Sequence, residues 1–170
     1  ISTQLPSSAA SDVYKRQVKE ALKKGLPVEL SLIPFVESQF DPYAQSSTGA
    51  SGIWQFIPST ARENGLKKNW WYDGRRDILA STEAAYTFLT SLYEKYDDWL
   101  IAIAAYNAGP SRIRREIEKN KSNGLPTDFW SLNLPRETKA YVPKILALVE
   151  VIRQPEKYNI ELPFLANRPY

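Results

Sequence analysis

The stretch from Leu30 to Phe40 reads LSLIPFVESQF, and Glu37 is the one carboxylate in this run of mostly aliphatic and aromatic residues. An ionised carboxylate in apolar surroundings is costly unless it is paired with a cation or its pKa rises. Two interpretations of Glu37 follow. It is either half of a structural ion pair, or the acid of an enzyme that holds its proton near neutral pH.

Two further stretches place polar side chains beside apolar ones. In GASGIWQF, Gln55 lies between apolar residues just after a glycine-rich loop, and in AAYNAG, Tyr106 and Asn107 end an apolar segment. Polar groups in such positions need hydrogen-bond partners, which come from the protein or from a ligand. Taken singly, each has a structural interpretation, because Gln55 could cap its own loop and Asn107 could end a helix.

The composition excludes several kinds of active site. The chain of 170 residues contains neither histidine nor cysteine, so Ser-His and Cys-His nucleophiles and histidine-ligated metals are ruled out. Carboxylates, tyrosines and amides remain as catalytic groups, and we expect no metal or cofactor. The net charge is only +3, and the stretch RIRREIEKNK is typical of a solvated helix surface, so no nucleic-acid partner is predicted.

The spacing of apolar residues predicts the helices that must position these groups. They are expected over about residues 18–24, 27–37, 58–64, 77–96, 98–108, 111–121 and 137–153. Pro34 should kink or loosen the second of them just before Glu37. The segment from Trp99 to Tyr106 is apolar all round, which indicates a helix at the centre of a domain. The predicted fold class is all-α, with the other helices packed around this segment.

Four stretches of the sequence together resemble one family. They follow, in order and spacing, the motifs of soluble-lytic-transglycosylase-like domains: ELSLIPFVESQFDPYA, GASGIWQFIPSTA, AAYNAGPSRI and ETKAYVPKILAL. Two more stretches, NWWYDGRRDILAST and TDFWSLNLPRETKAYVPK, resemble the membrane-bound lytic murein transglycosylase D type. The resemblance runs from about Gly25 to the end of the chain.

The resemblance implies a lysozyme-like helical fold, related to the goose-type lysozymes, and cleavage of the bond between N-acetylmuramic acid and N-acetylglucosamine in peptidoglycan. It implies that Glu37 is the catalytic residue. It assigns substrate binding to Ser38, Ser46, Gly52, Trp54, Gln55, Tyr106, Asn107 and Tyr141. Trp54 stands where the family more often has methionine, which alters the expected pocket wall. The implied partner is the peptidoglycan glycan strand, the implied location is the periplasm or cell envelope, and a monomer is expected.

A mechanism with a single acid fits this sequence. Most glycosidases use two carboxylates, but here only Glu37 sits in a stretch that looks catalytic, since Asp41 in FDP is typical of a turn. Glu37 would protonate the glycosidic oxygen and then take the proton of the muramic 6-hydroxyl, which closes onto C1 to give a 1,6-anhydro sugar. The alternatives are a goose-type lysozyme, in which water attacks instead, and an inactive glycan-binding module.

The ends of the chain are interpreted separately. Ser7 to Gln17, SSAASDVYKRQ, is identical to one reading frame of a transposon-end adapter, so residues 1–17 are predicted to be a non-native tail that adds nothing to the fold. Residues 18–153 are expected to form the catalytic domain and residues 154–170 a C-terminal extension. A membrane contact is expected only through an N-terminal anchor outside this sequence.

Overall fold

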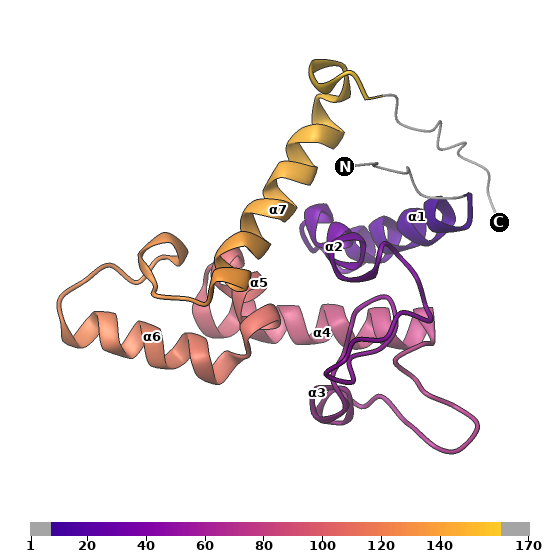
Figure 1. Cartoon of the computed structure of the whole chain (residues 1–170), viewed down its shortest axis with the longest axis horizontal. Coiled ribbons are helices and arrows are strands. Elements are labelled where there is room, and N and C mark those ends of the chain that lie inside the picture. Colours follow the sequence, from indigo (N-terminus) through magenta and orange to yellow (C-terminus); the bar gives the residue numbers. More distant parts are fainter. Residues whose placement is uncertain (1–7, 161–170) are drawn as a thin grey trace.

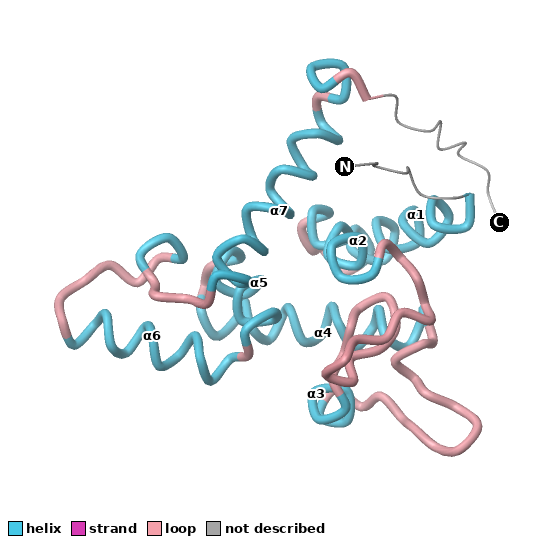
Figure 2. The backbone as a smooth tube through the Cα atoms, viewed as in Figure 1, coloured by secondary structure: helices cyan, strands magenta, loops and turns pink. Residues whose placement is uncertain are grey.

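The computed structural model describes residues 8–160, and Figures 1 and 2 show that this part of the chain is built from helices and loops. The helices are α1 (Ser8–Lys23), η1 (Val28–Leu32), α2 (Ile33–Ser38), α3 (Pro58–Glu63), α4 (Ile78–Tyr96), α5 (Trp99–Ala108), α6 (Pro110–Ser122), η2 (Phe129–Ser131), α7 (Arg136–Arg153) and η3 (Pro155–Tyr158), where η marks a 3-10 helix. Within residues 8–160 the only β-type pairing consists of isolated bridges. The predicted all-α fold is confirmed.

Helix α5 forms the centre of the fold. Its residues from Ile101 to Ala105 are buried, and α4, α6 and α7 all pack against it. Asp98 caps its start by accepting hydrogen bonds from the backbone N–H groups of residues 100 and 101, at 2.7 and 3.1 Å, and Gly109 ends it at a φ of 88°. In Figure 1, α4 crosses the middle of the molecule, and α6 and α7 leave from the end where α5 lies. The predicted central helix is therefore confirmed.

The segment that carries Glu37 differs from the predicted single helix. It is a 3-10 helix followed by the six-residue helix α2, in which Pro34 lies in the first turn. A proline in the first turn removes no helical hydrogen bond, so Pro34 starts this helix and does not kink it. Gln39 and Phe40 then adopt φ values of 54° and 64° and end the helix. Glu37 consequently lies in the last turn of a short helix.

The loop from Gly49 to Phe56 is held by a buried arginine. Arg75 is 4% exposed, and its Nη1 donates to the carbonyl oxygens of Gly49 and Phe56 at 2.7 and 3.2 Å. Its Nη2 and Nε pair with Asp73, at 2.7 Å and 2.9 Å. The backbone of Gly52 approaches so closely that a Cβ atom there would lie 1.8 Å from the carbonyl oxygen of Arg75. Figure 2 shows the long loops before and after α3 on the same side of the molecule.

The first described helix corrects the prediction for the N-terminal segment. Helix α1 begins at Ser8 and not near Val18. Gln17 is fully buried, its side-chain Oε1 accepts from Thr82 at 2.9 Å, and its backbone carbonyl accepts from the hydroxyl of Tyr86 at 2.8 Å. The prediction that residues 1–17 add nothing to the fold is therefore wrong for residues 8–17, because α1 packs along α4. Residues 1–7 and 161–170 lie outside the described residues, and the adapter origin of the tail stays a prediction.

The described chain continues from α7 into η3, which packs against α7. Over residues 8–160, none of the helices combines the length and the apolar composition that a bilayer crossing requires. The expected limit of the catalytic domain at residue 153 coincides with the end of α7 and stays a prediction.

Candidate active site

Glu37 and Tyr141 form the centre of the candidate site. The hydroxyl of Tyr141 donates a hydrogen bond of 2.5 Å to Oε1 of Glu37. Tyr141 is buried, while Glu37 is half-buried. The two residues meet because α7 packs against both α2 and the central α5. Since Tyr141 occupies Oε1, the second carboxyl oxygen of Glu37 is the one that can carry and release a proton.

The electrostatics of Glu37 separate the two interpretations of this residue. Burial raises the pKa of Glu37 to about 7, the hydrogen bond from Tyr141 opposes this, and the charge of Glu137 adds to it. Among the ion pairs within residues 8–160, none includes Glu37. Glu37 is therefore not half of a structural ion pair, and a carboxylic acid that is half protonated near neutral pH can give and accept protons.

Two hydroxyl groups fasten the neighbouring loop to the helices around Glu37. Ser38 Oγ donates to the carbonyl oxygen of Ile53 at 3.0 Å, and the Tyr106 hydroxyl donates to the carbonyl oxygen of Trp54 at 2.7 Å. Burial, and secondly the charge of Glu37, raise the pKa of the Tyr106 hydroxyl well above its usual value. The structure thus brings Ser38 and Tyr106 to the candidate site, with their hydroxyl protons engaged by the backbone of the loop.

The prediction that Trp54 contacts substrate does not fit its position. Its side chain is fully buried, with 0% of its surface exposed to solvent. Its Nε1 donates to Thr82 Oγ1 on α4 at 3.1 Å. The ring also meets Tyr86 edge-on at a centroid distance of 5.3 Å. A side chain without solvent-accessible area cannot touch a substrate, and Trp54 instead anchors its loop to the core. The prediction for Trp54 is therefore corrected, and we describe it as a core residue.

Gln55 and Ser46 act within their own loop. Gln55 Nε2 donates to the carbonyl oxygens of Gly52 and Ala44, at 2.8 and 3.2 Å. Ser46 Oγ accepts from the N–H of Ala50 at 3.0 Å. These contacts match the structural interpretation of Gln55 as a loop-capping amide, and within residues 8–160 no hydrogen bond joins it to Glu37. Its Oε1 is the atom left to accept from a ligand, so a binding role for Gln55 and Ser46 stays a prediction.

Asn107 is oriented by a residue that the sequence did not single out. Thr138 Oγ1 donates to Asn107 Oδ1 at 2.8 Å, and Thr138 is 2% exposed. Because the oxygen of the planar amide faces Thr138, the Nδ2 amino group faces the opposite way and can donate to a ligand. Thr138 precedes Tyr141 by three positions on α7, which places both on one face of that helix. The spacing of Thr138 and Tyr141 in ETKAY was therefore the sequence signal that could have identified Thr138.

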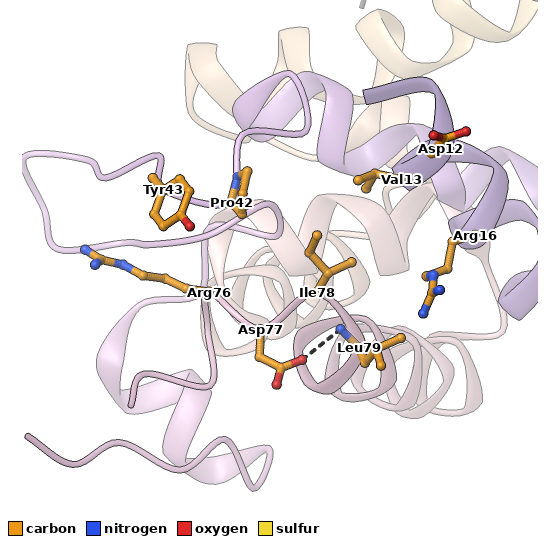
Figure 3. Close-up of a pocket in the computed structure, with 9 residues that line it drawn as sticks. All are labelled: Asp12, Val13, Arg16, Pro42, Tyr43, Arg76, Asp77, Ile78 and Leu79. Atoms are coloured by element: carbon orange, nitrogen blue, oxygen red, sulfur yellow. Dashed lines mark hydrogen bonds between the residues drawn. The ribbon is translucent and has the colours of Figure 1, made fainter. Parts of the chain in front are cut away.

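A separate hollow lies on another part of the molecule. It has a volume of about 470 Å³ between α1, residues 42–43 and the start of α4. Figure 3 shows the arginines and aspartates among its lining residues, with Asp77 bonded to the N–H of Leu79 as the cap of α4. None of the predicted site residues lines it, so it is separate from the candidate site. Over residues 8–160, no group of three or more carboxylates is arranged to hold a metal ion.

Comparison with known proteins assigns the chain to a family. The model of the Transglycosylase SLT domain matches residues 16–127. The chain is 51% identical to the membrane-bound lytic murein transglycosylase D of Escherichia coli K12 over 142 residues, which are 83% of this chain and 31% of that protein. It is also 35% identical over 170 residues to an Alteromonas protein provisionally named for tributyltin chloride resistance, covering 98% of this chain and 79% of that one.

Solved structures support the same assignment. The fold matches the lytic transglycosylase Slt of Pseudomonas aeruginosa, solved as an inactive glutamate-to-glutamine mutant, with a TM-score of 0.61 and 28% identity over 86% of this chain and 24% of that one. It matches the soluble lytic transglycosylase Slt70 of Escherichia coli with a TM-score of 0.62 and 25% identity, over 94% and 26% of the two chains. The chain thus spans less than a third of the E. coli transglycosylase D.

Proposed function

Because the chain belongs to the Transglycosylase SLT domain family, we propose that it is a lytic transglycosylase. The proposed reaction cleaves the glycosidic bond between N-acetylmuramic acid and N-acetylglucosamine in peptidoglycan and leaves 1,6-anhydro-N-acetylmuramic acid ends. The relatives that are named as murein transglycosylases support the substrate class. The pairing of a half-buried, unpaired Glu37 with the buried hydroxyl of Tyr141 is the observation that carries the proposal.

In the first step Glu37 acts as a general acid. Its proton passes to the bridging oxygen as the bond from that oxygen to C1 of the muramic residue breaks, and the N-acetylglucosamine leaves with a free hydroxyl group. The pKa of about 7 keeps a large share of Glu37 protonated at neutral pH. The N-acetyl group of the substrate can stabilise the positive charge that develops at C1, as in substrate-assisted glycosidases.

In the second step the ionised Glu37 acts as a general base. It removes the proton of the muramic 6-hydroxyl, and that oxygen forms a bond to C1 and closes the anhydro ring. The proton that left Glu37 in the first step is thereby restored, so the cycle consumes no water. One carboxyl group is sufficient for these two steps, since the nucleophile belongs to the substrate.

Two neighbours are assigned supporting roles. The Tyr141 hydroxyl holds Oε1 of Glu37 and is a stronger donor to the ionised form, so it stabilises Glu37 after proton transfer. The Nδ2 group of Asn107, turned away from Thr138, is suited to donate to the carbonyl oxygen of an N-acetyl group. Both contacts would fix the sugar and the acid relative to each other, which is a large part of catalysis.

Hydrolysis of the goose-lysozyme type is the second candidate. A two-carboxylate mechanism needs a second acid that acts as nucleophile or base, and Glu137, near the start of α7, is the carboxylate whose charge is felt at Glu37. No hydrogen bond connects Glu37 and Glu137 within residues 8–160. The relatives named as lytic murein transglycosylases favour the single-acid mechanism, in which the 6-hydroxyl of the substrate attacks.

Mass spectrometry of the products from purified peptidoglycan tests the proposal. Anhydro ends are expected. Reducing ends would establish a hydrolase, and release of no fragment by a folded protein would establish a glycan-binding module. A monomeric state and a place in the cell envelope, where murein is found, are part of the same proposal, and ultracentrifugation and cell fractionation test them.

A further inference from the structure

The connection between α3 and α4 exposes three aromatic side chains in a row. Trp70 and Trp71 are 87% and 91% exposed, and Tyr72 follows at 41%. Figure 1 shows this connection as a loop that reaches away from the helices at the edge of the molecule. We call residues 69–72 the aromatic turn. Two neighbouring indole rings in water are unusual for a folded domain and mark a surface that meets something else.

Hydrogen bonds hold the backbone of the aromatic turn, while the rings of Trp70 and Trp71 are exposed and the Tyr72 hydroxyl donates to Asp77 Oδ2 at 3.0 Å. Asn69 Oδ1 accepts from the N–H groups of Trp71 and Tyr72 at 2.9 and 2.8 Å. The N–H of Asn69 donates to the carbonyl oxygen of Tyr72 at 2.8 Å, and Lys68 and Asp73 form an isolated bridge at the base. The two tryptophans are therefore presented by a preformed turn, and a partner does not have to order the backbone.

Basic residues flank the aromatic turn in the sequence. Residues 66–76 contain four basic side chains and one acidic one, a net charge of +3 that equals the net charge of the whole chain. The acidic residue, Asp73, is held by Arg75 at 2.7 Å and lies 3.7 Å from Lys68. Lys67 and Arg76 are exposed on either side of the turn in the sequence, and their positive charge is complementary to an anionic surface.

We propose that the aromatic turn is a contact site for anionic lipid bilayers, in which Trp70 and Trp71 enter the headgroup region and Lys67, Lys68 and Arg76 face lipid phosphates. Tryptophan and tyrosine favour the membrane interface because their rings are apolar with one polar edge. Basic residues near such a surface add about 1 kcal/mol of attraction each. The contact is independent of the proposed cleavage reaction, and it involves none of the residues around Glu37.

The degree of exposure favours lipid over a glycan strand as the occupant. A ring that stacks on a sugar needs one fixed orientation, and neighbouring side chains normally provide it by covering the opposite face. Trp70 and Trp71 are about nine-tenths exposed, so within residues 8–160 no neighbour covers either ring. A fluid interface surrounds an inserted ring on all sides and requires no fixed orientation.

Sedimentation of the full chain with vesicles tests the proposal. We expect binding to vesicles of phosphatidylcholine mixed with phosphatidylglycerol, weaker binding to phosphatidylcholine alone, and loss of binding as salt is raised. The double variant Trp70→Ser, Trp71→Ser should bind at least about tenfold more weakly. Lys67→Gln should reduce binding to the anionic vesicles about fivefold, from about 1 kcal/mol per basic residue, and leave binding to neutral ones unchanged.

Trp130→Ser is the matched control, because Trp130 is also exposed, at 63%, but lies on η2. It should bind vesicles like the unchanged chain. Quenching of the tryptophan fluorescence of Trp130→Ser by brominated lipids gives a second measurement that does not depend on how the double variant folds. Absence of vesicle binding and quenching overturns the proposal. So does an equal loss of binding in Trp130→Ser.

Two further outcomes also overturn it. If the double variant keeps vesicle binding but loses sedimentation with insoluble peptidoglycan, the turn is a glycan contact. If the unchanged chain forms a dimer in ultracentrifugation that the double variant does not form, the turn joins two copies of the chain. Turnover of a soluble glycan substrate should be equal in all variants. A failure of the lipid-contact proposal can therefore be distinguished from a failure of the proposed cleavage reaction.

Discussion

The hydroxyl of Tyr141 lies 2.5 Å from Oε1 of Glu37, although the two residues are 104 positions apart in the chain. This contact connects the short helix α2 with the first half of α7, and α7 also packs against the central α5. It gives the candidate acid one fixed oxygen and one oxygen available for proton transfer.

Replacement of Glu37 by glutamine should abolish cleavage, with a loss of at least about 100-fold, because an amide keeps the shape of the side chain but cannot cycle a proton. The free energy of unfolding should stay level or rise slightly, since a desolvated acid becomes a neutral amide. Turnover on peptidoglycan and thermal melting measure the two effects. An active variant, or one that is inactive only because it is unfolded, would contradict the catalytic role.

The Tyr141→Phe variant should shift the pH dependence of kcat/KM. The hydrogen bond from Tyr141 lowers the pKa of Glu37, so its removal should raise that pKa further. Since the free enzyme needs Glu37 protonated, activity should fall with rising pH near pH 7 in the unchanged chain and at a higher pH in the variant, with a lower maximum. Tyr43→Phe is the control, because Tyr43 is 75% exposed. An unshifted alkaline limb would remove Tyr141 from this role.

The stability of the domain should depend on pH through Glu37. The folded-state pKa of about 7 lies above the usual 4.5, so the folded state binds more protons than the unfolded state between these values. The free energy of unfolding should therefore decrease as pH rises from about 4.5 to 7, by a total on the order of 3 kcal/mol, and the loss should level off above pH 7. In Glu37→Gln this contribution should disappear. Denaturant titrations of both proteins across this range provide the test, and identical pH profiles would refute it.

Asn107→Ala should weaken binding of chitin-like oligomers or lower turnover while the domain stays folded, because it removes the donor proposed for an N-acetyl group. Thr138→Val should give a smaller loss, since Asn107 remains but its amide is no longer oriented. Thr138→Ser keeps the hydroxyl and should restore most of the function. Binding is measured by calorimetry and folding by circular dichroism. Native-like Asn107→Ala with unchanged binding and turnover would rule out this role.

Gly52→Ala should destabilise the fold strongly, by about 3 kcal/mol or more, on the scale of severe backbone clashes. The residue has a φ of 81°, and its new Cβ would lie 1.8 Å from the backbone oxygen of Arg75, which cannot move away as a side chain could. Gly49→Ala is the matched control, because Gly49 has a φ of 84° but no atom near its Cβ position. It should lose only about 1 kcal/mol from the left-handed conformation. Equal losses in urea titrations would show that the contact with Arg75 is unimportant.

The sequence by itself determined most of the helices and the identity of the candidate acid, but not the start of α1 or the form of the segment that carries Glu37. Apolar periodicity and end signals are local, so they located α4 and α5, the stop at Gly109 and a cap at Asp97 or Asp98, of which the structure selects Asp98. The isolation of Glu37 in an apolar run predicted a raised pKa because the neighbours in sequence are also neighbours in space within one helical turn. The ordered motifs likewise placed Tyr106, Asn107 and Tyr141 in the candidate site.

The tertiary structure decided which side chains face solvent and which partners they meet. Trp54 and Gln55 are adjacent in the sequence, yet one is buried against Tyr86 on α4 and the other caps its own loop. The hydrogen bond of Thr138 to Asn107, the support of the loop by Arg75 and the packing of Gln17 against α4 join residues that are far apart in the chain. Burial and hydrogen-bond partners depend on how separate elements pack, and a pattern confined to one element carries no information about that packing.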